Sequence, residues 1–88
     1  MTEDDRFLAA FDALPMGRFF GSFDGKRFRV MRSVLVADRA VKLEAEELDG
    51  SGYINFNIYR LKDGMAFVKP FDMPKSSVYA FTMALKPD

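Results

Sequence analysis

Four apolar side chains near the start of the chain recur at the spacing of an amphipathic helix. They are Phe7, Leu8, Phe11 and Leu14. Thr2 can cap such a helix, and the acidic residues that follow it lie where the helix dipole favours negative charge. Pro15 and Gly17 interrupt the pattern, so the sequence predicts a helix over residues 3–14.

From residue 17 to residue 70, apolar and polar positions alternate instead, which is the pattern of half-buried strands. Short turn sequences separate the runs, and Asp24-Gly25 is the strongest hairpin signal among them. Strands are expected at residues 17–23, 26–36, 41–47, 53–61 and 65–69. Further turns are expected at residues 37–40, 49–52 and 62–64. The first and last of these strands are short, and we expect them at the edges of the sheet.

A second helix is expected to begin at Met73-Pro74 and to end at Pro87. Its apolar stripe consists of Val78, Phe81 and Leu85. No gap between the predicted strands holds a crossover helix, which argues against a parallel sheet. The sequence therefore predicts one α+β domain over residues 1–88. Its core architecture is an antiparallel meander of about five strands, with one helix at each terminus packed on one sheet face.

Strand alternation places the apolar side chains on the face beneath the helices and leaves the other face open to solvent. The helix-facing set is Phe28, Val30, Leu43, Ile54, Phe56 and Ile58. The open set is Arg27, Arg29, Met31, Lys42, Glu44, Glu46, Tyr53, Asn55, Asn57 and Tyr59. Arg32 breaks the pattern because it occupies a position that alternation assigns to the apolar face of its strand. We expect a strand end or a β-bulge there, and a one-residue slip would exchange the two faces of that strand.

Composition limits the chemistry available to the chain. There is no cysteine and no histidine, which removes thiolate chemistry, the commonest metal ligands and the side chain that titrates near neutral pH. The serines therefore have no histidine to activate them, and no glycine-rich phosphate loop precedes a helix. Each cluster of acidic residues lies along one predicted helix or strand, whereas a site for a hard metal ion needs ligands from several elements. We expect no cofactor and no metal, and an enzyme of unidentified type is the least favoured interpretation.

Location is suggested by what the sequence lacks. No apolar run approaches the roughly 20 residues that a membrane-spanning helix needs, and the acidic start does not resemble a secretory signal peptide. The absence of cysteine is also typical of proteins from reducing compartments. We therefore expect a cytoplasmic protein that does not enter a membrane.

The open face carries the residues best suited to recognition. Tyr53, Asn55, Asn57 and Tyr59 alternate along one strand. Tyrosine offers a rigid contact area with a polar end, and asparagine both donates and accepts hydrogen bonds. The simpler interpretation is a solvated sheet face, because aromatic residues suit strands for structural reasons alone. The leading hypothesis is a non-catalytic protein-interaction module that uses this face or an edge strand. Its partner would be an unknown protein or a second copy.

A basic strand suggests another function. Residues 26–32 carry four basic and no acidic side chains, Arg27 and Arg29 among them, with phenylalanines nearby. Proteins that bind single-stranded nucleic acid combine phosphate attraction with base stacking in this way. The pI of about 6.2 and the nearby Glu44 and Glu46 favour instead a sheet whose charges pair with one another.

Overall fold

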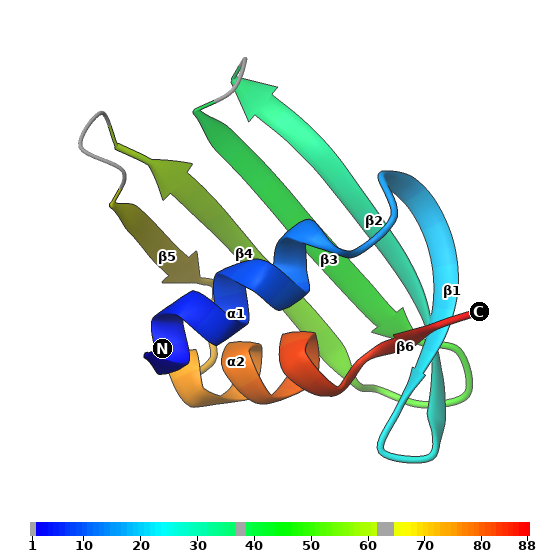
Figure 1. Cartoon of the computed structure of the whole chain (residues 1–88). Coiled ribbons are helices and arrows are strands. Elements are labelled where there is room, and N and C mark those ends of the chain that lie inside the picture. Colours follow the sequence, from blue (N-terminus) through cyan, green and yellow to red (C-terminus); the bar gives the residue numbers. More distant parts are fainter. Residues whose placement is uncertain (1, 37–38, 62–64) are drawn as a thin grey trace.

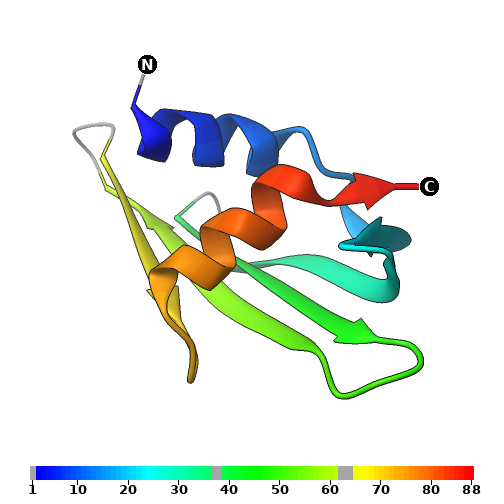
Figure 2. The same ribbon diagram turned by 90° about the horizontal axis from the view of Figure 1, so that it is seen from below.

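The computed structural model describes residues 2–36, 39–61 and 65–88. Both helices lie on one face of an antiparallel sheet (Figures 1 and 2). The helices are α1 (Glu3–Asp12) and α2 (Lys75–Ala84). The strands are β1 (Gly17–Phe23), β2 (Lys26–Val36), β3 (Ala40–Glu47), β4 (Tyr53–Arg60), β5 (Ala66–Pro70) and β6 (Lys86–Pro87). The predicted α+β architecture is confirmed, and a short sixth strand is added to it.

The described strands form one sheet in the order β5-β4-β3-β2-β1-β6. Every neighbouring pair is antiparallel, and β1 to β5 follow one another as the predicted meander. Asp24 and Gly25 both have positive φ, 54° and 74°, as a two-residue hairpin turn of type I′ requires. The turn predicted at 62–64, and the first half of the turn predicted at 37–40, lie outside the described residues.

The first helix begins with a capping box. Asp5 N donates to Thr2 Oγ1 at 3.1 Å, and Thr2 N donates to Asp5 Oδ2 at 3.3 Å. The helix ends at Asp12, two residues earlier than predicted. The early end follows from Pro15, which disfavours helical backbone at the residue before it, Leu14.

The core lies between the two helices and the sheet. Of the apolar residues predicted for the two helices, Leu8 is half-buried and the others are buried: Phe7, Phe11, Leu14, Val78, Phe81 and Leu85. So are Phe28, Val30, Leu43, Phe56 and Ile58 of the sheet, while Ile54 is half-buried and packs against them. The ring of Phe7 contacts Phe56 and stacks on Tyr79, with centroid distances of 5.8 and 4.2 Å. This one ring therefore joins α1 to both β4 and α2, and burying such a ring contributes about 1.5–3 kcal/mol.

The second helix is shorter than predicted, because the chain leaves it to form β6. It ends at Ala84 and not at Pro87. Pro87 favours extended backbone in the residue before it, and β6 pairs with Gly21 and Ser22 of β1. Of the two predicted edge strands, β5 is at an edge, while β1 is partly covered by β6.

Neither irregularity expected at Arg32 is present. Arg32 has a regular partner in β3, and the register shift of β2 lies further along, between Val34 and Val36. The Arg32 side chain points toward the C-terminal end of α1, where Nη1 donates to the backbone oxygens of Phe11 (3.0 Å) and Leu14 (2.7 Å). Because the register does not slip at Arg32, both sheet faces keep the side chains that alternation assigned to them.

Candidate functional site

The open sheet face is formed by alternate side chains of β1 to β5, which point away from the helices. Cross-strand register shows which residues share this face, because partners in an antiparallel pair lie on the same side. The six residues predicted to bind a partner all lie on it: Arg27, Arg29, Tyr53, Asn55, Asn57 and Tyr59. They differ, however, in exposure and in the side chains that they already contact.

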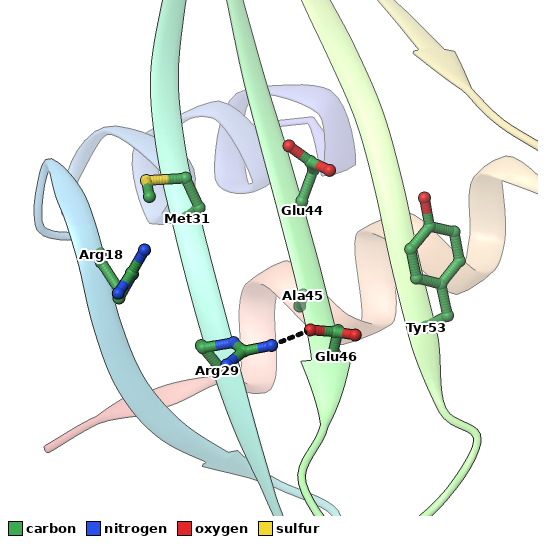
Figure 3. A pocket seen from close by; sticks show the side chains of 7 residues that line it. All are labelled: Arg18, Arg29, Met31, Glu44, Ala45, Glu46 and Tyr53. Atoms are coloured by element: carbon green, nitrogen blue, oxygen red, sulfur yellow. Dashed lines mark hydrogen bonds and ion pairs between the residues drawn. The ribbon is translucent and has the colours of Figure 1, made fainter.

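A hollow of about 480 Å³ lies across β1, β2, β3 and β4 on this face (Figure 3). It is lined by Arg18, Arg29, Met31, Glu44, Ala45, Glu46 and Tyr53. Figure 3 shows the arginines on β1 and β2, the glutamates on β3 and the tyrosine on β4. Two guanidinium groups and two carboxylates therefore balance in charge around one shallow depression.

Ion pairs between neighbouring side chains occupy most of these charges. Arg29 donates from Nη2 to Oε1 of Glu46, its direct cross-strand partner. Lys42 Nζ lies 3.7 Å from Oε1 of Glu44. Arg18 forms no ion pair with any residue that the structure describes. Arg18 is therefore the cation of this hollow that is most available to a partner.

Arg27 lies near the start of β2, outside the hollow, and its side chain binds that of Asp88. Its Nη1 and Nη2 donate to Oδ1 and Oδ2 of Asp88 at 2.6 and 2.5 Å. These two hydrogen bonds hold the pKa of Asp88 below its ordinary range. The pair adds little stability because both side chains are exposed. The pair joins Asp88 to the start of β2.

The alternating tyrosines and asparagines of β4 bind one another. Asn55 Nδ2 donates to the hydroxyl of Tyr53 at 2.7 Å, and Asn57 Nδ2 donates to the hydroxyl of Tyr59 at 3.0 Å. Asn57 is only 7% exposed, and Asn55 and Tyr59 are half-buried. Tyr53, at 51% exposure, is the member of this set that presents the most surface to a partner.

Two exposed aromatic residues of this face were not among the predicted site residues. Phe20 on β1 is 43% exposed, and Phe67 on β5 is 56% exposed. Phe67 stacks against its cross-strand partner Tyr59, with ring centroids 6.2 Å apart. Alternation along β1 and β5 could have assigned both phenylalanines to the open face, but short strands give a weak alternation signal. The face thus has an aromatic ring toward each lateral margin and Tyr53 between them.

The arginines of the basic strand do not share one surface. Arg27 and Arg29 lie on the open face, each in an ion pair with a carboxylate. Arg32 lies on the helix face, and its side chain is only 12% exposed. Burial lowers the pKa of Arg32 from its ordinary value. A phosphate backbone could therefore reach two of these three arginines only by displacing their partners.

Within the described ranges, no three acidic side chains meet in a way that could hold a metal ion. Tyr79 lies between α1 and α2, where its hydroxyl donates to Asp4 Oδ1 at 2.6 Å. Burial, this hydrogen bond and the nearby negative charges of Asp4 and Glu3 raise the pKa of Tyr79 far above its ordinary value. Tyr79 therefore stays protonated and joins the two helices.

No protein-family model, no curated protein and no solved structure matches the chain significantly. In the part of the chain that the structure describes, neither helix is long and apolar enough to cross a membrane.

Proposed function

We propose that the chain is a protein-interaction module that binds its partner with the open sheet face. The observation that carries the proposal is a set of three exposed rings, Phe20, Tyr53 and Phe67, spread over a face that no described element covers. Aromatic side chains on a rigid sheet lose little conformational freedom on binding and dominate the energetics of many protein interfaces.

The hollow beside Tyr53 suits a partner with both polar and apolar groups. Arg18 can donate to a partner carboxylate, while the Arg29–Glu46 pair already satisfies its own charges. Balanced charge creates no strong field that would select a polyanion. A mixture of rings, one available guanidinium and paired charges resembles the polar and aromatic composition of protein interfaces.

Photo-crosslinking tests this proposal. A benzophenone amino acid in place of Tyr53 should form adducts with the partner in extracts of the native cell. The same probe in place of Met83, which is exposed on α2, should not. Adding Phe67→Ser to the Tyr53 probe should reduce the adduct, whereas adding Met16→Ser, away from the face, should leave it unchanged. Equal adducts from the two probe positions would contradict the proposal.

Sedimentation velocity identifies whether the partner is a second copy of the chain. A dimer of the purified protein that dissociates on Tyr53→Ser with Phe67→Ser would show self-association through this face. A dimer that survives both changes would place self-association elsewhere, and the crosslinked partner would then have to be a different protein.

Single-stranded nucleic acid is the alternative partner, favoured by the available cation Arg18 beside exposed rings. Fluorescence anisotropy with oligonucleotides of mixed sequence separates the two ideas. Binding that weakens steeply with salt and is lost in Arg18→Gln would favour nucleic acid over protein. No change in anisotropy at low salt would remove this alternative.

A further inference from the structure

A second hollow lies on the helix side of the sheet, beyond the C-terminal end of α1. The ends of β2, β3 and β4 extend past α1 there (Figure 1). The hollow measures about 300 Å³ and is lined by Met16, Arg32, Val34, Arg39, Val41 and Arg60. Val34 and Val41 are cross-strand partners on the parity that faces the helices. The sheet therefore separates this arginine hollow, as we name it, from the hollow on the open face.

Among the described residues around the arginine hollow, positive charge exceeds negative charge. Three guanidinium groups line the hollow, and two of them, Arg32 and Arg60, share the carboxylate of Asp12 at the end of α1. Arg60 Nη2 donates to Asp12 Oδ1 at 2.6 Å, and Arg32 Nη2 lies 3.9 Å from the same oxygen. Arg39 is exposed and forms no ion pair with a described residue. Among the described residues, one carboxylate for three cations leaves room for another negative group.

Arg32 is held rigidly in this arrangement. Its Nη1 donates to backbone oxygens at the end of α1, and its guanidinium lies over the ring of Phe11, 4.5 Å from the centroid. Burial lowers the pKa of Arg32, the charge of Asp12 raises it, and the like charge of Arg60 lowers it again. The repulsion between Arg32 and Arg60 is a cost that a bound anion would relieve.

The remaining walls of the arginine hollow are apolar. Met16 and Val34 are exposed, and Val41 is half-buried. The backbone of Arg39 is tied to β4, because Arg60 N donates to Arg39 O at 2.8 Å. Of the two more exposed guanidiniums, one therefore belongs to a residue whose backbone is bonded to β4 and the other belongs to β4 itself, and both lie beside an apolar wall.

We propose that the arginine hollow binds a small organic oxyanion, either a carboxylate or a phosphate, that has a short apolar body. Arg39 and Arg60 bind the oxyanion, since a guanidinium can donate two parallel hydrogen bonds to such a group. Met16, Val34 and Val41 contact the body. A volume of about 300 Å³ lies at the small end of the usual range for ligand pockets, so the ligand is a small molecule. Asp12 competes with it for Arg60.

NMR titration at constant ionic strength tests the ligand class. Phenyl phosphate and hexanoate should shift the backbone amides of Val34, Val41 and Arg60. Phenyl phosphate should bind more tightly than inorganic phosphate, and hexanoate more tightly than acetate, because the body contacts the apolar wall. Tighter binding within either pair supports the proposal and identifies the preferred head group. Equal affinity within both pairs, or no shifts at millimolar concentrations, would overturn it.

Three charge variants test the residues, with phenyl phosphate as the probe. Arg39→Gln should weaken binding about tenfold or more, as expected for the loss of a hydrogen bond to a charged group. Asp12→Asn should strengthen binding, because it removes the competitor of Arg60. Arg18→Gln is the matched control, since it makes the same change of net charge on the opposite face of the sheet. Equal weakening by Arg18→Gln and Arg39→Gln would indicate attraction by net charge alone and overturn the proposal. Unchanged affinity in Asp12→Asn would also overturn it.

Discussion

Arg32→Met should lower the free energy of unfolding by about 2–4 kcal/mol, a large change for one side chain of a sheet. The guanidinium donates to two backbone oxygens at the end of α1, at 3.0 and 2.7 Å. The last carbonyls of a helix have no partner within the helix, although Phe11 O also accepts from Leu14 N at 3.1 Å. Arg32 therefore acts as a cap for the C-terminal end of α1, although it belongs to β2 and does not follow the helix in sequence.

The magnitude follows from two opposing terms. Hydrogen bonds to charged groups contribute about 1.5–3 kcal/mol each, which gives roughly 3–6 kcal/mol for two. Burial of the guanidinium opposes this gain, as the lowered pKa of Arg32 indicates. Methionine keeps most of the apolar stem and its packing but leaves the carbonyls of Phe11 and Leu14 without this donor. A net loss of about 2–4 kcal/mol is a large fraction of the 5–15 kcal/mol typical of a folded domain.

Urea denaturation followed by circular dichroism measures this loss. With a slope near 1 kcal/mol/M, the low end for small proteins, the midpoint should fall by about 2 M or more. Arg18→Met, which removes an exposed arginine without an ion pair among the described residues, should change stability by no more than about 0.5 kcal/mol. Arg32→Lys should fall between the two, because lysine keeps the charge without the planar fork. If Arg32→Met were no worse than Arg18→Met, the carbonyl contacts would contribute nothing to stability.

Two further predictions concern the packing of the chain termini and helices. Gly21→Ala should destabilise the fold by about 1–3 kcal/mol, because the new Cβ would lie 2.9 Å from the backbone oxygen of Lys86. Urea denaturation measures this loss. Ser22→Ala should show no comparable loss, because the side chain of Ser22 points to the open face. Stability should also fall as pH rises above about 10, the ordinary pKa of tyrosine, because the unfolded chain releases the Tyr79 proton before the folded chain does. Tyr79→Phe should flatten this decline in a pH series of thermal melts, and an unchanged slope would refute the role of Tyr79.

Alternation along β2, β3 and β4 was sufficient to predict both faces of this part of the sheet. Side chains on a strand have a period of two, so runs such as Tyr53 to Arg60 determine their own faces once one side is apolar. The same rule brings side chains two residues apart onto one face. It could therefore have predicted that each asparagine of β4 would bond to a neighbouring tyrosine, which the sequence analysis treated as free for recognition.

Arg32 shows where a local pattern stops being informative. A charged residue on an apolar parity indicates an irregular strand when only the strand is considered. The actual cause is the end of α1, 18 and 21 residues away at Leu14 and Phe11. No periodicity within β2 carries that information, because it depends on how the helix crosses the sheet. β6 was missed for a related reason, since two residues are too few to show alternation.

The edges of the sheet offer a partner less than its open face does. On one side, β6 pairs with β1, and Asp88 N donates to Phe20 O at 3.0 Å, which uses part of the β1 edge. A second copy of the chain could not pair along that part of β1 without displacing the C-terminal residues. Self-association by strand pairing would therefore have to use mainly β5.

The β5 edge is short and interrupted. Phe71 N donates to Asn55 O of β4, and backbone groups alternate in direction along a strand. Ala66, Val68 and Pro70 therefore point their backbone groups away from the sheet, and proline has no N–H to donate. Only two N–H groups of β5 are left for an added strand, too few for a stable ladder without side-chain contacts. A partner that pairs with this edge would have to gain most of its affinity from the neighbouring rings, such as Phe67. Loss of these rings should therefore weaken binding whether the partner covers the open face or pairs with β5.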